Sequence, residues 1–170
     1  SINKYTEKEP KDKNQYHLVL LAENNLGYQN LMKIVSEGYV NGFYYKPRVD
    51  HDVLKEYSQG IIALSGCLGG EIPKHLLDGN YKKAKEIALK YNNIFGQNNF
   101  FLEIQDHGME EQKRINGQLL KLSEETGIPL VATNDVHYLR REDAIVHDVL
   151  LCIQTGKTID DRDRMRFPTN

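Results

Sequence analysis

Four short, almost continuously apolar runs constrain the fold of this chain more than any other feature. They occupy residues 18–22, 61–64, 100–104 and 130–132. A strand with one solvent-facing side usually alternates between apolar and polar residues, whereas a strand buried on both faces is apolar throughout. Three of the four runs are of the second kind. The runs therefore predict strands of a parallel sheet that is covered on both sides.

Segments with helical periodicity lie between and after these runs. Apolar residues recur at helical spacing in four groups, which are Leu31, Ile34, Val35 and Tyr39; Ala84, Ile87, Ala88, Tyr91 and Phe95; Ile115, Leu119 and Leu122; and Ile145, Val149, Cys152 and Ile153. The third group is followed by Gly127 and Pro129, a usual helix stop. Strands that alternate with helices of this length predict an α/β fold with a mainly parallel sheet.

Composition and charge narrow the functional classes. The chain has 22 basic and 24 acidic residues and a net charge of −2, so it lacks the basic balance of a free-standing nucleic-acid binder. No apolar run approaches the roughly 20 residues of a membrane span, and no signal-peptide pattern is present. Two distant cysteines, Cys67 and Cys152, favour a reducing, cytoplasmic compartment. The polar start and the uncapped end predict a segment of a longer protein.

Side chains capable of metal chemistry follow three of the apolar runs. Cys67 follows the second run, His107 the third, and Asp135 and His137 the fourth. The carboxyl ends of parallel strands meet at one edge of a sheet, which brings these residues together. Thiolate, imidazole and carboxylate are ligands of zinc, manganese or iron. In an extended segment, residues i and i+2 point the same way, so Asp135 and His137 can face one ion.

Each of these residues also has a structural interpretation. A lone cysteine after a buried strand is more often a small core residue than a ligand, and Asp often caps helices while His satisfies loops. The same-side rule also pairs Glu103 with Gln105, and Gln105 with His107. The residues alone thus leave open a metal site, a phosphate site, or no site at this edge.

Several blocks of the chain resemble the polymerase and histidinol phosphatase (PHP) domain of bacterial replicative DNA polymerase III alpha subunits. The blocks are residues 16–24, 27–31, 46–50, 60–69, 101–108, 131–138, 144–154 and 158–167. The run Val-Ala-Thr-Asn-Asp-Val-His-Tyr at 131–138 is the most specific. The resemblance implies a distorted βα barrel, present here as an incomplete barrel of the later strands and helices. It implies a partial PHP domain at 16–156, a polar lead-in at 1–15, and a link toward a polymerase domain at 157–170.

The resemblance further implies divalent metal ions (zinc, manganese or magnesium) and 3′–5′ exonuclease activity. The residues that match the family's metal ligands are His17, Cys67, Asp135 and His137. The expected catalytic residues are Asp135, His137 and His107. The family's early His-x-His, Asp, His and Glu ligands have no counterpart in this chain. We therefore expect the chain alone to bind metal weakly or not at all, and to lack nuclease activity.

His17 precedes its apolar run instead of following it. If all the strands ran in one direction, His17 would lie at the opposite edge of the sheet from Cys67. Two explanations are open at this point. Either the strand begins earlier, near Lys13, or it runs in the opposite sense to its neighbours.

Other functions stay open beside the exonuclease. They are a non-catalytic PHP scaffold that braces the polymerase, and a stand-alone PHP phosphatase such as histidinol phosphatase. The expected partners are DNA, bound through the full-length polymerase, the other polymerase domains and replisome subunits, with no membrane. An open edge beside residues 100–104 predicts self-association of an incomplete barrel. Residues 43–48 interleave aromatic and basic side chains, which either bind single-stranded DNA or, as the sequence favours, pack their rings on the barrel.

Overall fold

The computed structural model describes residues 4–8 and 15–166 and confirms the α/β class. Four strands form one sheet in the order β1-β2-β3-β4. Their bounds are Val19–Ala22 for β1, Ile61–Leu64 for β2, Phe100–Ile104 for β3 and Leu130–Ala132 for β4, in agreement with the four apolar runs. Strands β2, β3 and β4 are parallel, whereas β1 is antiparallel to β2. The sheet is therefore mainly parallel, with one reversed strand at its edge.

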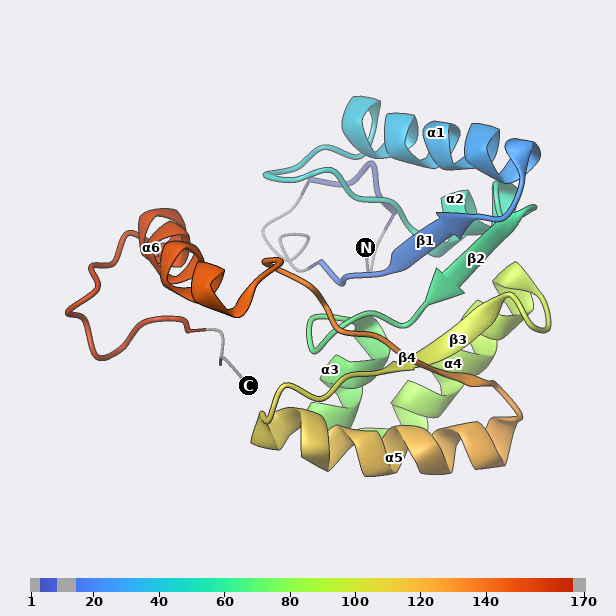
Figure 1. The fold of residues 1–170 in the computed structure, drawn as a ribbon. Coiled ribbons are helices and arrows are strands. Elements are labelled where there is room, and N and C mark those ends of the chain that lie inside the picture. The colour runs from blue at the N-terminus through green and yellow to red at the C-terminus, as the bar shows by residue number, and fades with distance from the viewer. Residues whose placement is uncertain (1–3, 9–14, 167–170) are drawn as a thin grey trace.

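Helices follow each strand, as expected for βα units. Their bounds are Asn25–Val40 for α1, His51–Glu56 for α2, Glu71–Leu77 for α3, Tyr81–Phe95 for α4, Glu110–Thr126 for α5 and Ala144–Thr155 for α6, with a short 3-10 turn η2 at Arg141–Asp143. Figure 1 shows α1 beside the β1 end of the sheet and α5 beside the β4 end. The fold agrees with a partial PHP-type βα barrel.

The hydrophobic core lies where α4 and α5 pack against one face of the sheet. The predicted apolar groups of both helices are buried in full, namely Ala84, Ile87, Ala88, Tyr91, Phe95, Ile115, Leu119 and Leu122. Phe100 and Leu102 of β3 point toward these helices and are inaccessible to solvent. Helix α5 ends at Gly127, whose φ of 70° places it in the left-handed region that glycine adopts without cost.

Helix α1 buries only part of the predicted face, because Ile34 is buried and Leu31 packs against the core, but the rest of the stripe is not covered. Val35 and Tyr39 are exposed, whereas the buried positions are Gly27, Asn30, Ile34 and Gly38. The reason is a close approach between backbones, because a Cβ atom on Gly27 would lie 1.8 Å from the carbonyl oxygen of Gly60. Glycine, and not an apolar side chain, forms this contact, so hydrophobic periodicity alone did not indicate it.

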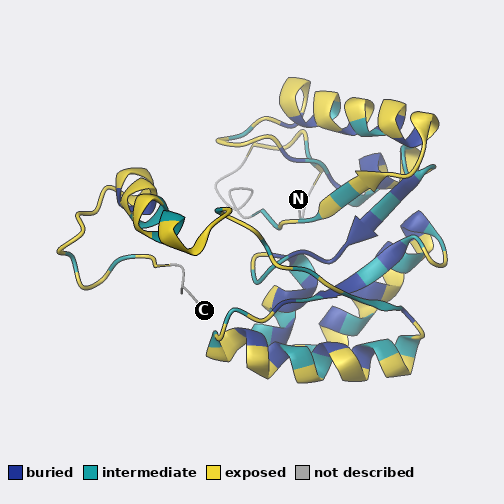
Figure 2. Cartoon of the chain, in the orientation of Figure 1, coloured by how far each residue is buried: buried dark blue, intermediate teal, exposed yellow. Residues whose placement is uncertain are grey.

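Helix α6 lies apart from the sheet and from the helices that pack on it (Figure 1). Cys152 is buried as predicted, but Ile145, Val149 and Ile153 of the same predicted core stripe are exposed. Figure 2 shows much of α6 in the colour of exposed residues. Periodicity indicates an apolar face but cannot show whether another element covers it, so this part of the prediction is wrong. In the described part of the chain, no helix combines the length and apolar character needed to cross a bilayer.

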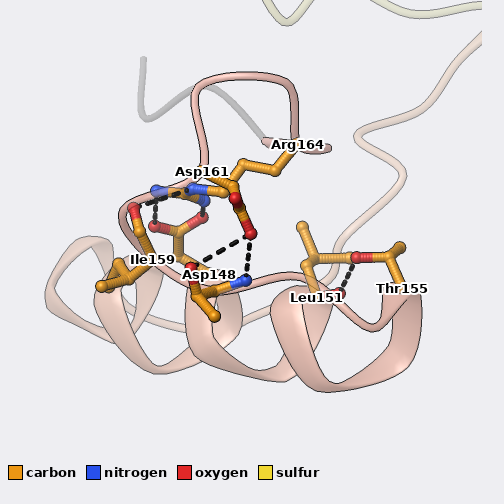
Figure 3. A network of polar contacts seen from close by, with 7 residues as sticks. Asp148, Leu151, Thr155, Ile159, Asp161 and Arg164 are labelled. Atoms are coloured by element: carbon orange, nitrogen blue, oxygen red, sulfur yellow. Dashed lines mark hydrogen bonds and ion pairs between the residues drawn. The ribbon is translucent and has the colours of Figure 1, made fainter.

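The segment after α6 folds back onto the helix. The Arg164 guanidinium forms a two-pronged ion pair with Asp148, and its Nε donates a hydrogen bond to the Ile159 carbonyl over 3.2 Å (Figure 3). Thr158 donates its backbone N–H to Asp161 over 2.7 Å. These contacts are local to α6 and its tail. The ion pair of Arg164 with Asp148 therefore holds this segment on α6.

Strands β1 and β4 form the two edges of the sheet. Residues 100–104 form β3, which pairs with β2 on one side and with β4 on the other. The prediction of an open edge beside residues 100–104 is therefore wrong. A continuous apolar run is what a central strand shows, because both of its faces are covered.

Part of the predicted lead-in contacts the domain. Tyr5 donates its backbone N–H to Asp50 over 3.2 Å and its hydroxyl to Glu37 over 2.9 Å. Residues 4–8 thus lie against the start of α2 and the end of α1. Residues 1–3 and 9–14 of the predicted lead-in, and 167–170 of the predicted link, lie outside the described residues.

Candidate metal centre

The reversed direction of β1 brings His17 to the edge of the sheet where β2 ends. Because β1 is antiparallel to β2, Val19 pairs with Leu64, and His17 donates its backbone N–H to the Gly69 carbonyl over 3.0 Å. His17 Nδ1 lies 3.4 Å from Cys67 Sγ. Of the two explanations open for His17, the opposite strand direction is therefore the one observed.

The distance between His17 and Cys67 suits two ligands of a single ion. With ordinary zinc–sulfur and zinc–nitrogen distances, a tetrahedral angle separates the two ligand atoms by roughly 3.5 Å. The donor set of thiolate and imidazole favours zinc or another thiophilic metal over magnesium, which prefers oxygen. In the absence of an ion, the same contact is a hydrogen bond between thiol and imidazole. The pair thus fits two positions of a metal shell.

The surroundings of Cys67 oppose a free thiolate. Burial raises the pKa of the Cys67 thiol, and the negative charges of Asp135 and Glu103 raise it further, while a backbone N–H of Gly69 acts in the opposite direction. Cys67 is half-buried and has no disulfide partner. The thiol is therefore protonated near neutral pH unless a cation replaces that proton.

Asp135 and His137 lie on the loop after β4. Asp135 adopts a left-handed backbone with φ of 43°, which is uncommon for residues other than glycine, Asn and Asp. His137 Nδ1 lies 2.6 Å from the Asp135 carbonyl oxygen, so a neutral His137 donates from Nδ1 and carries its lone pair on Nε2. This is the usual tautomer of a metal-binding histidine whose other nitrogen is held by a carbonyl. The His147 ring of α6 lies 5.4 Å from the His137 ring.

His107 has a partner at each ring nitrogen. Gln112 Nε2 lies 2.9 Å from His107 Nδ1 and donates to it, and His107 Nε2 lies 2.6 Å from the Asn134 carbonyl oxygen and donates to that atom. Gln112 also accepts the backbone N–H of His107 over 2.8 Å. In this arrangement the imidazole ties the loop after β3 to the loop that carries Asp135. His107 thus supports the edge, and a direct catalytic role for it stays a prediction.

A buried carboxylate lies directly beneath these loops. Glu103 of β3 is 5% exposed. It accepts the backbone N–H of Gly66 over 3.0 Å, the Gln105 side-chain amide over 2.9 Å and the Thr133 hydroxyl. The predicted same-side placement of Glu103 and Gln105 is confirmed. Glu103 therefore joins the Cys67 loop to the end of β4 through hydrogen bonds that a charged acceptor strengthens.

We expect Glu103→Gln to lower the free energy of unfolding by about 2 kcal/mol, because an amide presents a donor where Glu103 meets only donors. Urea unfolding measures the change. Glu110→Gln is the matched control, since Glu110 is exposed and forms a surface ion pair with Lys113 at 3.0 Å, and such a pair contributes little. Equal losses in the two variants would show that the buried network does not stabilise the edge.

Two of the predicted ligands, His17 and Cys67, lie in contact, but the described residues do not form a complete metal site. Over residues 4–8 and 15–166, no three His, Cys, Asp or Glu side chains are arranged to hold a metal ion. Asp135 lies near enough for its charge to act on Cys67, but the structure does not gather Asp135 and His137 into one ligand group with His17 and Cys67. The four-residue ligand set stays a prediction.

Three supporting residues were missed by the sequence reasoning. Ser65 accepts the Glu103 backbone N–H over 2.8 Å, Thr133 donates to the Glu103 carboxylate, and Gln112 holds His107. Ser65 directly follows β2 and Thr133 directly follows β4. Their positions at strand ends could therefore have indicated a role at this edge of the sheet. Gln112 is buried on α5, and its polar side chain gave no sign of burial.

Comparison with known families settles the affiliation of the chain. The model of the PHP domain matches residues 3–107, which is more than half of the chain. The chain belongs to the PHP domain family. The match includes His17, Cys67, Glu103 and His107 and stops before Asp135.

Related proteins extend the similarity beyond this PHP match. The chain is 48% identical over 155 residues to a DNA polymerase III subunit alpha of Treponema pallidum, 49% identical over 157 residues to that of Deinococcus radiodurans, and 49% identical over 157 residues to that of Thermus aquaticus. These alignments cover 91%, 92% and 92% of the chain, but 13%, 12% and 13% of the three relatives. The PHP chain thus spans about an eighth of their length.

Proposed function

We propose that this chain is the PHP region of a bacterial replicative DNA polymerase III alpha subunit and that its strand-end edge takes part in 3′–5′ exonuclease action. The observation that carries the proposal is the pair His17 and Cys67, whose ligand atoms lie 3.4 Å apart because the antiparallel pairing places the start of β1 beside the end of β2. The similarity to polymerase III alpha subunits over about nine-tenths of the chain supports the same assignment.

The proposed reaction consumes one water molecule and releases a deoxynucleoside monophosphate. The bond between phosphorus and the 3′ oxygen of the preceding nucleotide breaks, and that oxygen takes a proton. Divalent ions, when bound, supply a hydroxide nucleophile near neutral pH and neutralise charge on the phosphate. His17, Cys67, Asp135 and His137 would hold such ions, with further ligands from outside this chain. Glu103 and His107 keep the loops of Cys67 and Asp135 in position.

A scaffold without catalysis is the second candidate. It is favoured by the lack, among the described residues, of three His, Cys, Asp or Glu side chains arranged for one ion. In this role the domain braces the polymerase and binds replisome partners. A stand-alone phosphatase is disfavoured, because the named relatives are polymerase subunits.

The proposal also assigns setting and partners. As the PHP region of a DNA-directed DNA polymerase, the domain would act in the cytoplasm, in contact with DNA through the whole enzyme, with the other polymerase domains and with replisome subunits. Residues 16–156 would form the partial domain, and residues 157–170 the link toward the polymerase domain. The described part of that link, residues 157–166, lies with α6 apart from the sheet (Figure 1).

The experiment uses the full-length polymerase purified without chelators. We expect bound divalent metal by elemental analysis, and stepwise shortening of a 5′-labelled single strand from its 3′ end that a chelator stops. Metal-free enzyme with full polymerase activity and no shortening would favour the scaffold. The polymerase is prepared without its separate proofreading partner, so that any shortening of the strand cannot be due to that partner.

The 170-residue chain by itself is expected to behave differently from the whole enzyme. Metal affinity depends on the number of ligands and on a preformed site, and this chain supplies four of the proposed ligands. We expect elemental analysis to find less than one tightly bound ion per chain and the labelled strand to stay intact. Stoichiometric metal together with chelator-sensitive cleavage would contradict this expectation.

A further inference from the structure

The aromatic and basic loop at residues 43–48 borders a cavity beside the candidate metal pair. The cavity has a volume of about 490 Å³, and its lining includes Tyr16, His17, Tyr45, Lys46 and Lys74. Binding sites for small ligands commonly enclose about 300–1,000 Å³. The cavity is therefore large enough for a ligand of nucleotide size, and His17 belongs both to it and to the pair with Cys67.

The charge of the lining selects an anion. Lys46 and Lys74 contribute two ammonium groups, and among residues 4–8 and 15–166 no Asp or Glu lines the cavity. Lys74 pairs with Asp78 at 3.5 Å, but both side chains are about half exposed, so this ion pair is weak. A phosphate group that enters the cavity therefore gains attraction from the two lysine cations of its lining.

The aromatic residues of the lining suit a base. Tyr45 lines the cavity and is 66% exposed, so solvent reaches a large part of this residue. Its φ of 61° lies in the left-handed region, which is costly for a large side chain. The Tyr44 backbone N–H donates to the Lys46 carbonyl over 3.1 Å and closes this tight turn. The Tyr44 ring meets the Tyr45 ring edge-on at 4.7 Å and supports it.

We propose that this cavity binds the 3′-terminal nucleotide of a DNA strand, with Lys46 and Lys74 at the phosphate and Tyr45 stacked on the base. The inference rests on the proposed function and deepens it by naming a substrate subsite. The adjacency of His17 directs the 5′-phosphate of this nucleotide, which is the phosphodiester that the proposed exonuclease cleaves, toward the candidate metal pair. Stacking on tyrosine is tolerant of sequence, because every base has a π face, so the subsite would accept any of the four nucleotides.

The first test measures binding without hydrolysis. Deoxythymidine 5′-monophosphate is titrated into the 170-residue chain in the presence of a chelator, with thymidine and inorganic phosphate as half-ligands. We expect the monophosphate to bind more tightly than either half. The double variant Lys46→Gln, Lys74→Gln should weaken its binding about tenfold, and Tyr45→Ala should weaken it by a similar factor.

Matched variants control for charge and aromatic content. Lys82→Gln, Lys90→Gln removes two exposed cations of α4, and Tyr28→Ala removes an exposed ring of α1; neither group lines the cavity. We expect binding by both controls to equal that of the parent chain. An equal loss in the controls, or no binding of the monophosphate by the parent chain, would overturn the proposal. Thermal unfolding of each variant shows whether a loss of binding reflects misfolding. If it does, the charge-preserving variant Lys46→Arg is used in its place and must bind the monophosphate as the parent chain does.

The second test uses the full-length polymerase and separates the two proposals. If exonuclease action is present, Lys46→Gln, Lys74→Gln should raise KM for a single strand with little change in kcat, because the change removes ground-state binding. An unchanged KM would overturn the subsite and leave the exonuclease intact. If no exonuclease action is found, the titration with monophosphate still decides whether the cavity binds a nucleotide.

Discussion

Asp135→Asn in the full-length polymerase is expected to reduce 3′–5′ exonuclease activity about 100-fold or more, while DNA synthesis survives at least in part. The substitution keeps the size of the side chain and removes the charge that a metal ion needs, and loss of weaker supporting groups alone often costs 10–100-fold. Asn adopts the left-handed backbone of Asp135, with its φ of 43°, more readily than most residues. The fold of the loop should therefore persist.

Both activities are measured on the same preparation, one by shortening of a labelled strand and the other by primer extension. Asp52→Asn serves as the control, since Asp52 is an exposed acid at the start of α2 and outside the candidate site. We expect Asp52→Asn to leave both activities unchanged. Parallel loss of exonuclease and polymerase activity in Asp135→Asn would point to a bracing role for the site instead.

Phe100→Ala is expected to lower the free energy of unfolding by about 3–5 kcal/mol. Phe100 begins β3, is fully buried, and stacks against Tyr91 at a ring distance of 5.4 Å and against Phe95 at 6.5 Å. Removal of the ring leaves a cavity between the sheet and α4 that rigid neighbours cannot fill. Urea unfolding of the 170-residue chain measures the loss.

Phe43→Ala provides the comparison for this core variant. Phe43 carries the same side chain but is 47% exposed, so we expect its loss to cost about 1 kcal/mol or less. The contrast isolates burial as the cause. Similar losses for the two variants would mean that the ring stack of Phe100, Tyr91 and Phe95 does not contribute as the structure indicates.

Much of the fold follows from hydrophobic patterning, and the exceptions have physical causes. The strands and the buried faces of α4 and α5 were predictable, because apolar burial determines them. The direction of β1 was not, since an apolar run carries no mark of strand direction. The face of α1 depends on a backbone contact between Gly27 and Gly60, and the exposure of α6 depends on the lack of a covering element in the described structure. Local patterns contain neither piece of information.

The candidate site was predictable in part. Cys67, Asp135 and His137 were singled out because they follow strands, which is where parallel sheets gather their chemistry. The contact of His17 with Cys67 depends on strand direction, so the sequence alone left it open. Glu103 was paired with Gln105, but its hydrogen bonds to Gly66 and Thr133 link segments that are distant in the chain. Such links follow from the register of the sheet.

The antiparallel register of β1 has a consequence for the unfolded chain as well. His17 and Cys67 are 50 positions apart in the sequence, so an ion shared between them would cross-link a long loop that contains β1, α1, α2 and β2. A covalent cross-link of that span removes about 4 kcal/mol of conformational freedom from an unfolded chain. Edge strands are among the elements that open first in local fluctuations. A shared ion would therefore fasten the outermost strand to its neighbour, and removal of that ion would let β1 detach before the rest of the domain unfolds.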